Sequence, residues 1–249
     1  MRAPLLLISS IVLLLCYVRL VDGAAKIQRS GRPGVHAPLK GSDPYPWWTG
    51  VELGTAGGSP QIEAFLSFTC PDCRHHYEGI LKPLLKKFGH KISVVHQPFA
   101  LPFQDYSHDA VLAAYSVYRL SNNSVEAWTT YIEKIFTNQD IFFNCYELSQ
   151  RQVWHEYFGK WANEQGILTH DLISAMNGTV TTANYDAWYA ANYARQRTFA
   201  GAPQFIINRW LPVELDLPSW NLTRWEAWIT SALGSTSGGA ATTSKGGDL

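Results

Sequence analysis

Apolar and polar residues follow one another along the chain in patterns that predict strands in its first third. Residues 61–68 and 91–99 are short, mostly apolar runs, each typical of a central strand buried on both faces. Residues 50–55 predict a shorter edge strand. A helical pattern over residues 70–89 joins the two central runs, and Pro83 is expected to kink or break it. The order strand, helix, strand predicts a parallel pair of strands.

The middle of the chain has the period of amphipathic helices. Helices are expected over residues 107–120, from a capping box at Asn123 and Glu126 through Ile135, from a second capping box at Ser149 and Gln152, near residues 172–176, and over residues 183–197. In the last of these, Tyr185, Trp188 and Ala191 are expected to form the inner stripe. We interpret the aromatic stripes of these helices as core packing rather than a cofactor site.

Strand and turn signals return after the helical block. Residues 200–208 predict a turn leading into a strand, with which residues 211–215 could pair as a hairpin. Residues 220–233 predict a final amphipathic helix. The segment 234–249 is mostly Gly, Ser, Thr and Ala, which predicts a flexible tail. It has no hydrophobic stretch of the kind that a membrane span or a glycolipid anchor requires.

Composition and charge place the chain among globular proteins. Its 249 residues are 46% hydrophobic and 16% charged, so a full core can be buried. Lys and Arg number 20, as do Asp and Glu. This balance gives no electrostatic reason to expect nucleic acid or an anionic membrane as a partner.

The N-terminus has the features of a secretory signal peptide. A positively charged start, an apolar run over residues 5–18 and small residues at 21–24 predict a signal peptide over residues 1–23. Residues 24–48 would then form a leader arm. A retained membrane anchor is the alternative, but the run is short and Arg19 interrupts it. We expect cleavage and no remaining membrane span.

The chain contains three N-x-Ser/Thr triplets, which can be glycosylated in a protein that enters the secretory pathway. They begin at Asn122, Asn177 and Asn221, which are therefore candidate glycosylation sites. We expect a glycoprotein that is located in the lumen of the endoplasmic reticulum or secreted. The C-terminal sequence lacks the usual retention signal, so the choice between these two locations stays open.

The strongest chemical signal is the tetrapeptide Cys70-Pro71-Asp72-Cys73. It follows a predicted strand, and Pro71 suits the first position of a helix, so Cys70 is expected at the helix N-terminus. Unpaired N–H groups and the helix dipole favour a thiolate there. Cys73 is close enough to release whatever Cys70 captures. These residues predict thiol–disulfide exchange.

The order of the elements resembles the DsbA-like branch of the thioredoxin superfamily over residues 60–233. Two separated motifs carry the resemblance: the Cys-x-x-Cys sequence, and Gly201-Ala202-Pro203 leading into a strand. Residues 96–103 are similar to a eukaryotic secretory subgroup in which a histidine follows, and Gln104 stands in that place here. The resemblance implies an α/β thioredoxin-like fold over residues 49–233, with a helical insertion at about 104–198 before the C-terminal hairpin and helix.

The resemblance also assigns roles to residues. Cys70 would be the exposed attacking cysteine, Cys73 the buried resolving one, and the two would form the redox-active disulfide. Pro203 would be a cis-proline that turns the backbone of Ala202 toward the main chain of an incoming substrate. We expect a monomer without cofactor or metal, acting on proteins or peptides that carry thiols or disulfides, or on glutathione.

The chain departs from that branch in two places. Ala64 occupies the position where many relatives carry an acid, and the neighbouring Glu63 is expected on the other face of its strand. Asp72 places a negative charge beside the thiolate, which Arg74, His75 and His76 would offset if they turned inward. We therefore expect a less extreme oxidant than the strongly oxidising members.

Other interpretations of the cysteines stay open. A structural zinc site usually needs four ligands, and the chain has one Cys-x-x-Cys unit. A purely structural disulfide would close too short a loop to restrain much chain entropy. A redox-inactive binding module or holdase could use some of the ten tryptophans, and a glutathione-dependent isomerase is a further alternative. Cys145 is either a buried thiol or an intermolecular link.

Overall fold

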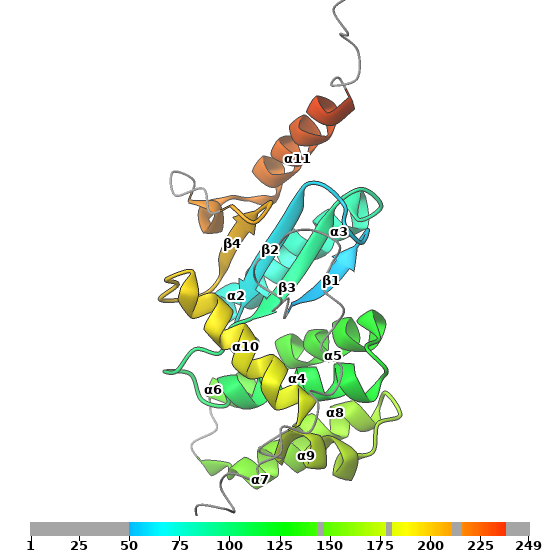
Figure 1. Ribbon diagram of the computed structural model, residues 1–249. Coiled ribbons are helices and arrows are strands. Elements are labelled where there is room, and N and C mark those ends of the chain that lie inside the picture. The colour runs from blue at the N-terminus through cyan, green and yellow to red at the C-terminus, as the bar shows by residue number, and fades with distance from the viewer. Residues whose placement is uncertain (1–49, 144–146, 178–180, 211–215, 238–249) are drawn as a thin grey trace, which may run out of the picture. The chain divides into compact units, whose positions relative to one another are not determined.

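The computed structural model describes residues 50–143, 147–177, 181–210 and 216–237, all within one unit, Trp47–Leu249 (Figure 1). Several expectations lie outside the described residues. These are the signal peptide and leader arm, Cys145, the second hairpin strand at residues 211–215 and the tail beyond residue 237.

A four-stranded sheet forms the centre of the described unit. Its strands are β1 (Val51–Gly54), β2 (Gln61–Leu66), β3 (Ser93–Pro98) and β4 (Gln204–Ile207), in the order β1-β3-β2-β4. The pair β2 and β3 is parallel, as predicted, and β1 is an antiparallel edge strand. On the other side of β2, the antiparallel strand β4 places Phe205 opposite Ala64. Every residue of β3 is buried, as expected for a central strand.

The helix between β2 and β3 is continuous but changes its winding. It comprises α2 (Pro71–His76), a π-helical turn η1 (Tyr77–Leu81) and α3 (Lys82–Phe88). Pro83 lacks the N–H that would complete the α-helical pattern, and the backbone widens into the π-helical turn just before it. The N–H of Lys82 bonds to the carbonyl of Tyr77, five residues earlier. The predicted break at Pro83 thus takes the form of a π turn, and the helix ends at Gly89 as predicted.

The predicted helical insertion is present between β3 and β4. It contains α4 (Ser107–Leu120), α5 (Val125–Thr137), α6 (Asp140–Phe143), α7 (Gln150–Gln152), the π-helical segment η3 (Val153–Gly159), α8 (Lys160–Asn163), α9 (Thr169–Asn177) and α10 (Thr182–Gln196). Figure 1 shows α4 to α9 gathered beyond one end of the sheet, with α10 leading back toward β4. The fold is therefore a thioredoxin-like α/β sheet with a helical block inserted between its two halves.

One of the two predicted capping boxes is correct. Ser149 accepts the N–H of Gln152, whose side chain reaches back to the N–H of Ser149. The capping box predicted at Asn123 is wrong, because Ser124 caps α5 and accepts the N–H of Ala127 at 3.1 Å. Asn123 has φ 61°, a left-handed conformation, whereas an N-cap residue is extended.

The predicted inner stripe of α10 is also wrong. Its buried residues are alanines at helical spacing: Ala183, Ala187, Ala190 and Ala194. Tyr185 is 45% exposed and Trp188 is 57% exposed. Small side chains let α10 lie close to α4 and to the sheet, so the larger aromatic rings lie on the outer side.

Helices cover both faces of the sheet. Because neighbouring strand residues point to opposite faces, Phe65 contacts Tyr193 of α10 while Ala64 faces the α2–α3 side. The final helix α11 (Leu222–Ser237) follows the 3-10 turn η4 (Leu217–Ser219) and packs against α3. It continues four residues past the predicted end at residue 233, through Gly234.

Candidate active site

Cys70 lies where the first central strand gives way to a helix. Strand β2 ends at Leu66, and Cys70 is the N-cap of α2, with φ −90° and ψ 124°. Pro71 occupies the first helical position, as predicted, where its missing N–H costs no hydrogen bond. The carbonyl of Cys70 accepts the N–H of Arg74 at 3.0 Å, which closes the first helical turn. The thiol is therefore placed at the helix N-terminus.

The two cysteines of the motif are free thiols, which is the reduced form of the predicted disulfide. Cys70 is 5% exposed and Cys73 is 0% exposed. The prediction that Cys73 is buried is confirmed, whereas the prediction that Cys70 is exposed is wrong. Cys70 is covered in part because its sulfur lies 3.7 Å from the carbonyl oxygen of Ala202. It is still the more accessible thiol of the pair.

The two thiols have opposite shifts in pKa. Hydrogen bonds lower the pKa of Cys70 to about 6, against the opposing effect of burial, and the largest contribution comes from the Cys73 thiol. The backbone N–H groups of Cys73 and Asp72 and the side chain of Gln104 supply the smaller part of this lowering. Burial raises the pKa of Cys73 far above its usual value, and the neighbouring Cys70 sulfur adds to this. At neutral pH, Cys70 is a thiolate and Cys73 is a thiol.

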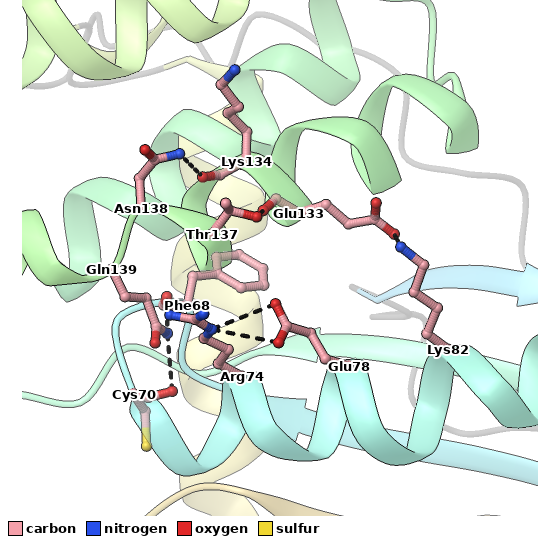
Figure 2. A network of polar contacts seen from close by, with 10 residues as sticks. All are labelled: Phe68, Cys70, Arg74, Glu78, Lys82, Glu133, Lys134, Thr137, Asn138 and Gln139. Carbon is pink, nitrogen blue, oxygen red and sulfur yellow. Dashed lines mark hydrogen bonds and ion pairs between the residues drawn. The ribbon is translucent and has the colours of Figure 1, made fainter.

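The predicted modulators act differently from expectation. Asp72 contributes its backbone N–H, and its side chain is exposed. Arg74 pairs with Glu78 at 3.5 Å instead of turning toward the sulfur (Figure 2). His75 is exposed, and none of the contacts within the described residues joins it to Cys70. Hydrogen bonds, rather than nearby cations, stabilise the thiolate.

The Gly201-Ala202-Pro203 motif lies next to the Cys-x-x-Cys motif in the folded protein. The Ala202–Pro203 peptide is cis, as predicted, and it precedes β4, which pairs with β2. The chain thereby brings the Ala202 carbonyl next to Cys70, 132 residues away in sequence. A second cis peptide, Ser59–Pro60, directly precedes the start of β2 and was not expected from the sequence.

Gln139 is a site residue that no sequence signal marks. It lies between α5 and α6, is 1% exposed, and donates its amide to the carbonyls of Phe68 at 2.8 Å and Cys70 at 3.0 Å (Figure 2). Phe68 lies past the end of β2, so its carbonyl needs a partner from elsewhere. The helical insertion thus holds the loop that carries Cys70.

Glu63 lies on the face of β2 opposite to Ala64, as predicted. Its carboxylate accepts the hydroxyl of Tyr193 at 2.9 Å and the amide of Gln97 at 3.2 Å. Burial raises its pKa, and these two hydrogen bonds counteract the increase in part. Since Glu63 faces α10 while Cys73 lies on the helix of the other face, Glu63 does not replace the missing acid at Ala64.

The candidate glycosylation sites are on the surface. Asn122, Asn177 and Asn221 are all exposed. Asn221 also accepts the N–H of Arg224 at 2.9 Å at the start of α11. Glycosylation itself stays a prediction.

Neither a metal-binding cluster nor a membrane-spanning helix is found among the described residues. These residues contain no group of three or more His, Cys, Asp or Glu side chains that could hold a metal ion. In the same part of the chain, no helix combines the length and the hydrophobicity that crossing a membrane demands.

Comparison with known proteins agrees with this geometry. The thioredoxin family model matches residues 48–210, and no curated protein matches the chain in sequence. Similar solved structures include oxidised BdbD from Bacillus subtilis, at 16% identity and TM-score 0.59, covering 75% of this chain and 94% of that one. Wolbachia pipientis alpha-DsbA1 has 14% identity and a TM-score of 0.59, and the match covers 75% of this chain and 92% of that one. The catalytic domain of Proteus mirabilis ScsC has 16% identity and a TM-score of 0.52, and the match covers 75% of this chain and 90% of that one. At such identities, the likeness establishes a DsbA-like fold.

Proposed function

Because the chain belongs to the thioredoxin family and has a DsbA-like fold, we propose that it is a thiol–disulfide oxidoreductase acting through Cys70 and Cys73. The observation that carries this proposal is the division of roles between the two thiols. One is a stabilised thiolate at a helix N-terminus, and the other is a buried thiol that donates a hydrogen bond to it. A nucleophile and a resolving group are thus adjacent.

The proposed reaction proceeds in two exchanges. The Cys70 thiolate attacks one sulfur of a partner disulfide, so a mixed disulfide forms and the other partner sulfur leaves as a thiolate. Cys73 then loses its proton, which the departing partner sulfur takes up, and attacks the Cys70 sulfur. The products are a Cys70–Cys73 disulfide and a partner dithiol, so the enzyme loses two electrons and the partner gains them. The reverse sequence oxidises a partner.

Proteins and peptides are the proposed substrates, with glutathione as a small-molecule partner. The carbonyl of Ala202 lies beside the reactive sulfur, where it could accept an N–H from the main chain of a substrate. Phe103 is 73% exposed and directly precedes Gln104, whose side chain accepts the hydroxyls of Ser67 and Thr69 just before Cys70. An exposed ring at this place favours an unfolded segment with apolar side chains over a small polar ligand.

Equilibration with glutathione tests the proposed function. In mixtures of reduced and oxidised glutathione, the protein is expected to form a Cys70–Cys73 disulfide and to lose the mass of two hydrogens. Because the hydrogen bonds to the thiolate stabilise only the reduced form, we expect a potential near or above the secretory poise, about −180 to −210 mV. Such a potential would make the protein an oxidase or isomerase, whereas one near about −270 mV would make it a reductase and leave exchange through Cys70 and Cys73 unaffected. No disulfide in excess oxidised glutathione would refute exchange.

We also propose that the protein works in the secretory pathway as a glycoprotein. Support comes from the N-terminal sequence and from the exposure of Asn122, Asn177 and Asn221. The protein expressed in eukaryotic cells is expected to migrate faster on a gel after N-glycosidase treatment. Unchanged mobility, together with a retained N-terminal segment in the mass spectrum, would contradict this location.

A second candidate function is a redox-inactive holdase. The exposed rings of Tyr185 and Trp188 on α10 favour it, since such rings can hold apolar segments of unfolded chains. Binding by a holdase would not depend on the Cys70 sulfur, whereas exchange requires it. A Cys70→Ser variant therefore distinguishes the two functions.

A further inference from the structure

The side chain of Gln139 holds two carbonyl groups of the turn that leads from β2 into α2. Residues 67–70 form this turn and belong to neither element. The amide nitrogen of Gln139 lies 2.8 Å from the carbonyl oxygen of Phe68 and 3.0 Å from that of Cys70 (Figure 2). Because a carbonyl oxygen can only accept a hydrogen bond, the amide must present its N–H₂ group to both, and its orientation is fixed.

The position of Gln139 is itself fixed by its surroundings. It lies between α5 and α6 and is 1% exposed. Its backbone carbonyl accepts the N–H of Phe142 at 2.9 Å, and its own N–H donates to the carbonyl of Phe136 at 3.4 Å. The ring of Phe136 in turn packs edge-on against that of Phe68, with 5.7 Å between the ring centroids. The helical insertion therefore presents the amide from a buried and well-bonded position.

The turn that Gln139 holds has contacts with both cysteines. At one end, the N–H of Ser67 donates to the Cys73 sulfur at 3.3 Å. At the other end, Cys70 carries the reactive sulfur, which points away from Gln139 in Figure 2. The Cys70 carbonyl also accepts the N–H of Arg74 at 3.0 Å, so two donors fix its direction. The conformation of this turn thus determines how the two sulfurs lie relative to each other.

We propose that Gln139 is a positioning residue for disulfide exchange, which holds the turn at the Phe68 and Cys70 carbonyls so that the Cys70 sulfur is aimed at a partner disulfide and kept beside Cys73. This inference rests on the proposed function, because exchange is the reaction that needs this geometry. Gln139 acts through the backbone of Cys70, since its amide bonds to the carbonyl and not to the sulfur. Without the amide, the turn is free to adopt other conformations, from which attack on a disulfide is slower.

Two substitutions of Gln139 test this role. Gln139→Met keeps the length of the side chain and removes the donor. Gln139→Glu introduces a carboxyl group, which donates one hydrogen bond when protonated and opposes both carbonyl oxygens when ionised. Asn138→Leu and Asn138→Asp are the matched controls, because the Asn138 amide also donates to a backbone carbonyl, that of Lys134 in α5, at 2.7 Å (Figure 2). Each variant is made in the full chain carrying Cys145→Ser.

The readout is the rate at which the reduced protein cleaves a fluorescent peptide disulfide, as a function of pH. At about pH 8.5 the Cys70 thiol, with its pKa of about 6, is ionised, so the rate reports geometry rather than ionisation. We expect Gln139→Met to be about five- to ten-fold slower there, the loss that one hydrogen bond produces. The rate of Gln139→Glu relative to Gln139→Met should fall as the pH rises, because the introduced carboxyl loses its proton. The Asn138 variants should match wild type.

A Gln139→Met variant that unfolds at lower urea concentration but exchanges at the wild-type rate would show a purely structural role and overturn the inference. A relative rate of Gln139→Glu that does not change with pH would also overturn it. Circular dichroism shows whether each variant is folded, and if one Gln139 variant does not fold, the other decides by comparison with its Asn138 control. A wild-type protein without exchange would refute the proposed function and this role with it, whereas equal exchange in wild type and Gln139→Met would refute the role of Gln139 alone.

Discussion

Replacing Cys70 with serine is expected to reduce disulfide exchange to the uncatalysed rate. A hydroxyl stays protonated at neutral pH, whereas hydrogen bonds lower the pKa of the Cys70 thiol to about 6 and make it a thiolate. Cys73 cannot take its place, because it is fully buried and burial raises its pKa. The measurement is the rate at which the reduced protein cleaves a fluorescent peptide disulfide.

Cys73→Ser is the informative partner variant. The introduced hydroxyl can still donate a hydrogen bond to the Cys70 sulfur, so the first attack should continue. The mixed disulfide should then accumulate, up to one peptide per protein, because no second thiol releases it. Cys145→Ser serves as the control for the remaining cysteine and should exchange like wild type. Equal exchange rates for wild type and Cys70→Ser would exclude the oxidoreductase and leave the holdase.

Trp128→Ala is expected to lower the free energy of unfolding by about 3–5 kcal/mol. Trp128 is 0% exposed, and its ring centroid lies 5.9 Å from that of Phe68 and 5.3 Å from that of Tyr115. Its Nε1 lies 3.4 Å from Nδ1 of His96, and burial lowers the pKa of His96 to about 3, which keeps this imidazole neutral and able to accept. The substitution therefore removes a large buried ring and one buried hydrogen bond.

Urea unfolding followed by circular dichroism measures this loss. Trp188→Ala is the matched control, because Trp188 is 57% exposed and its removal should change stability by no more than about 0.5 kcal/mol. Trp128 also contacts the ring of Phe68, two residues before Cys70. We therefore expect slower exchange in Trp128→Ala even where it is folded. Equal losses of stability in the two variants would contradict the assignment of Trp128 to the core.

Local patterns predicted the elements that carry the chemistry. Apolar runs located β2 and β3, and the Cys-x-x-Cys motif with Pro71 located the start of α2. Both features depend on residues that are neighbours in sequence, since a short apolar run favours a buried strand and a proline at the first helical position favours a helix start. The same local patterns misplaced the cap of α5, because Asn123 adopts a left-handed conformation and leaves the capping role to Ser124.

Local patterns could not decide which of two faces of one helix is buried. In α10, the alanines from Ala183 to Ala194 and the aromatic residues Tyr185 and Trp188 both have helical spacing. Periodicity therefore allows either stripe to face inward. Close packing against α4 and the sheet selects the small side chains, and this depends on the distance between elements that the sequence does not state.

The sequence by itself determined that Cys70 begins a helix and that a proline-led strand follows a helical insertion. Only the tertiary structure decided what surrounds the Cys70 sulfur. Ala202, Gln104 and Gln139 come from three distant segments, and each contributes one polar atom to the sulfur or to the turn that carries it. Long-range packing sets these positions, because a hydrogen bond requires its donor and acceptor to be close in space whatever their separation along the chain.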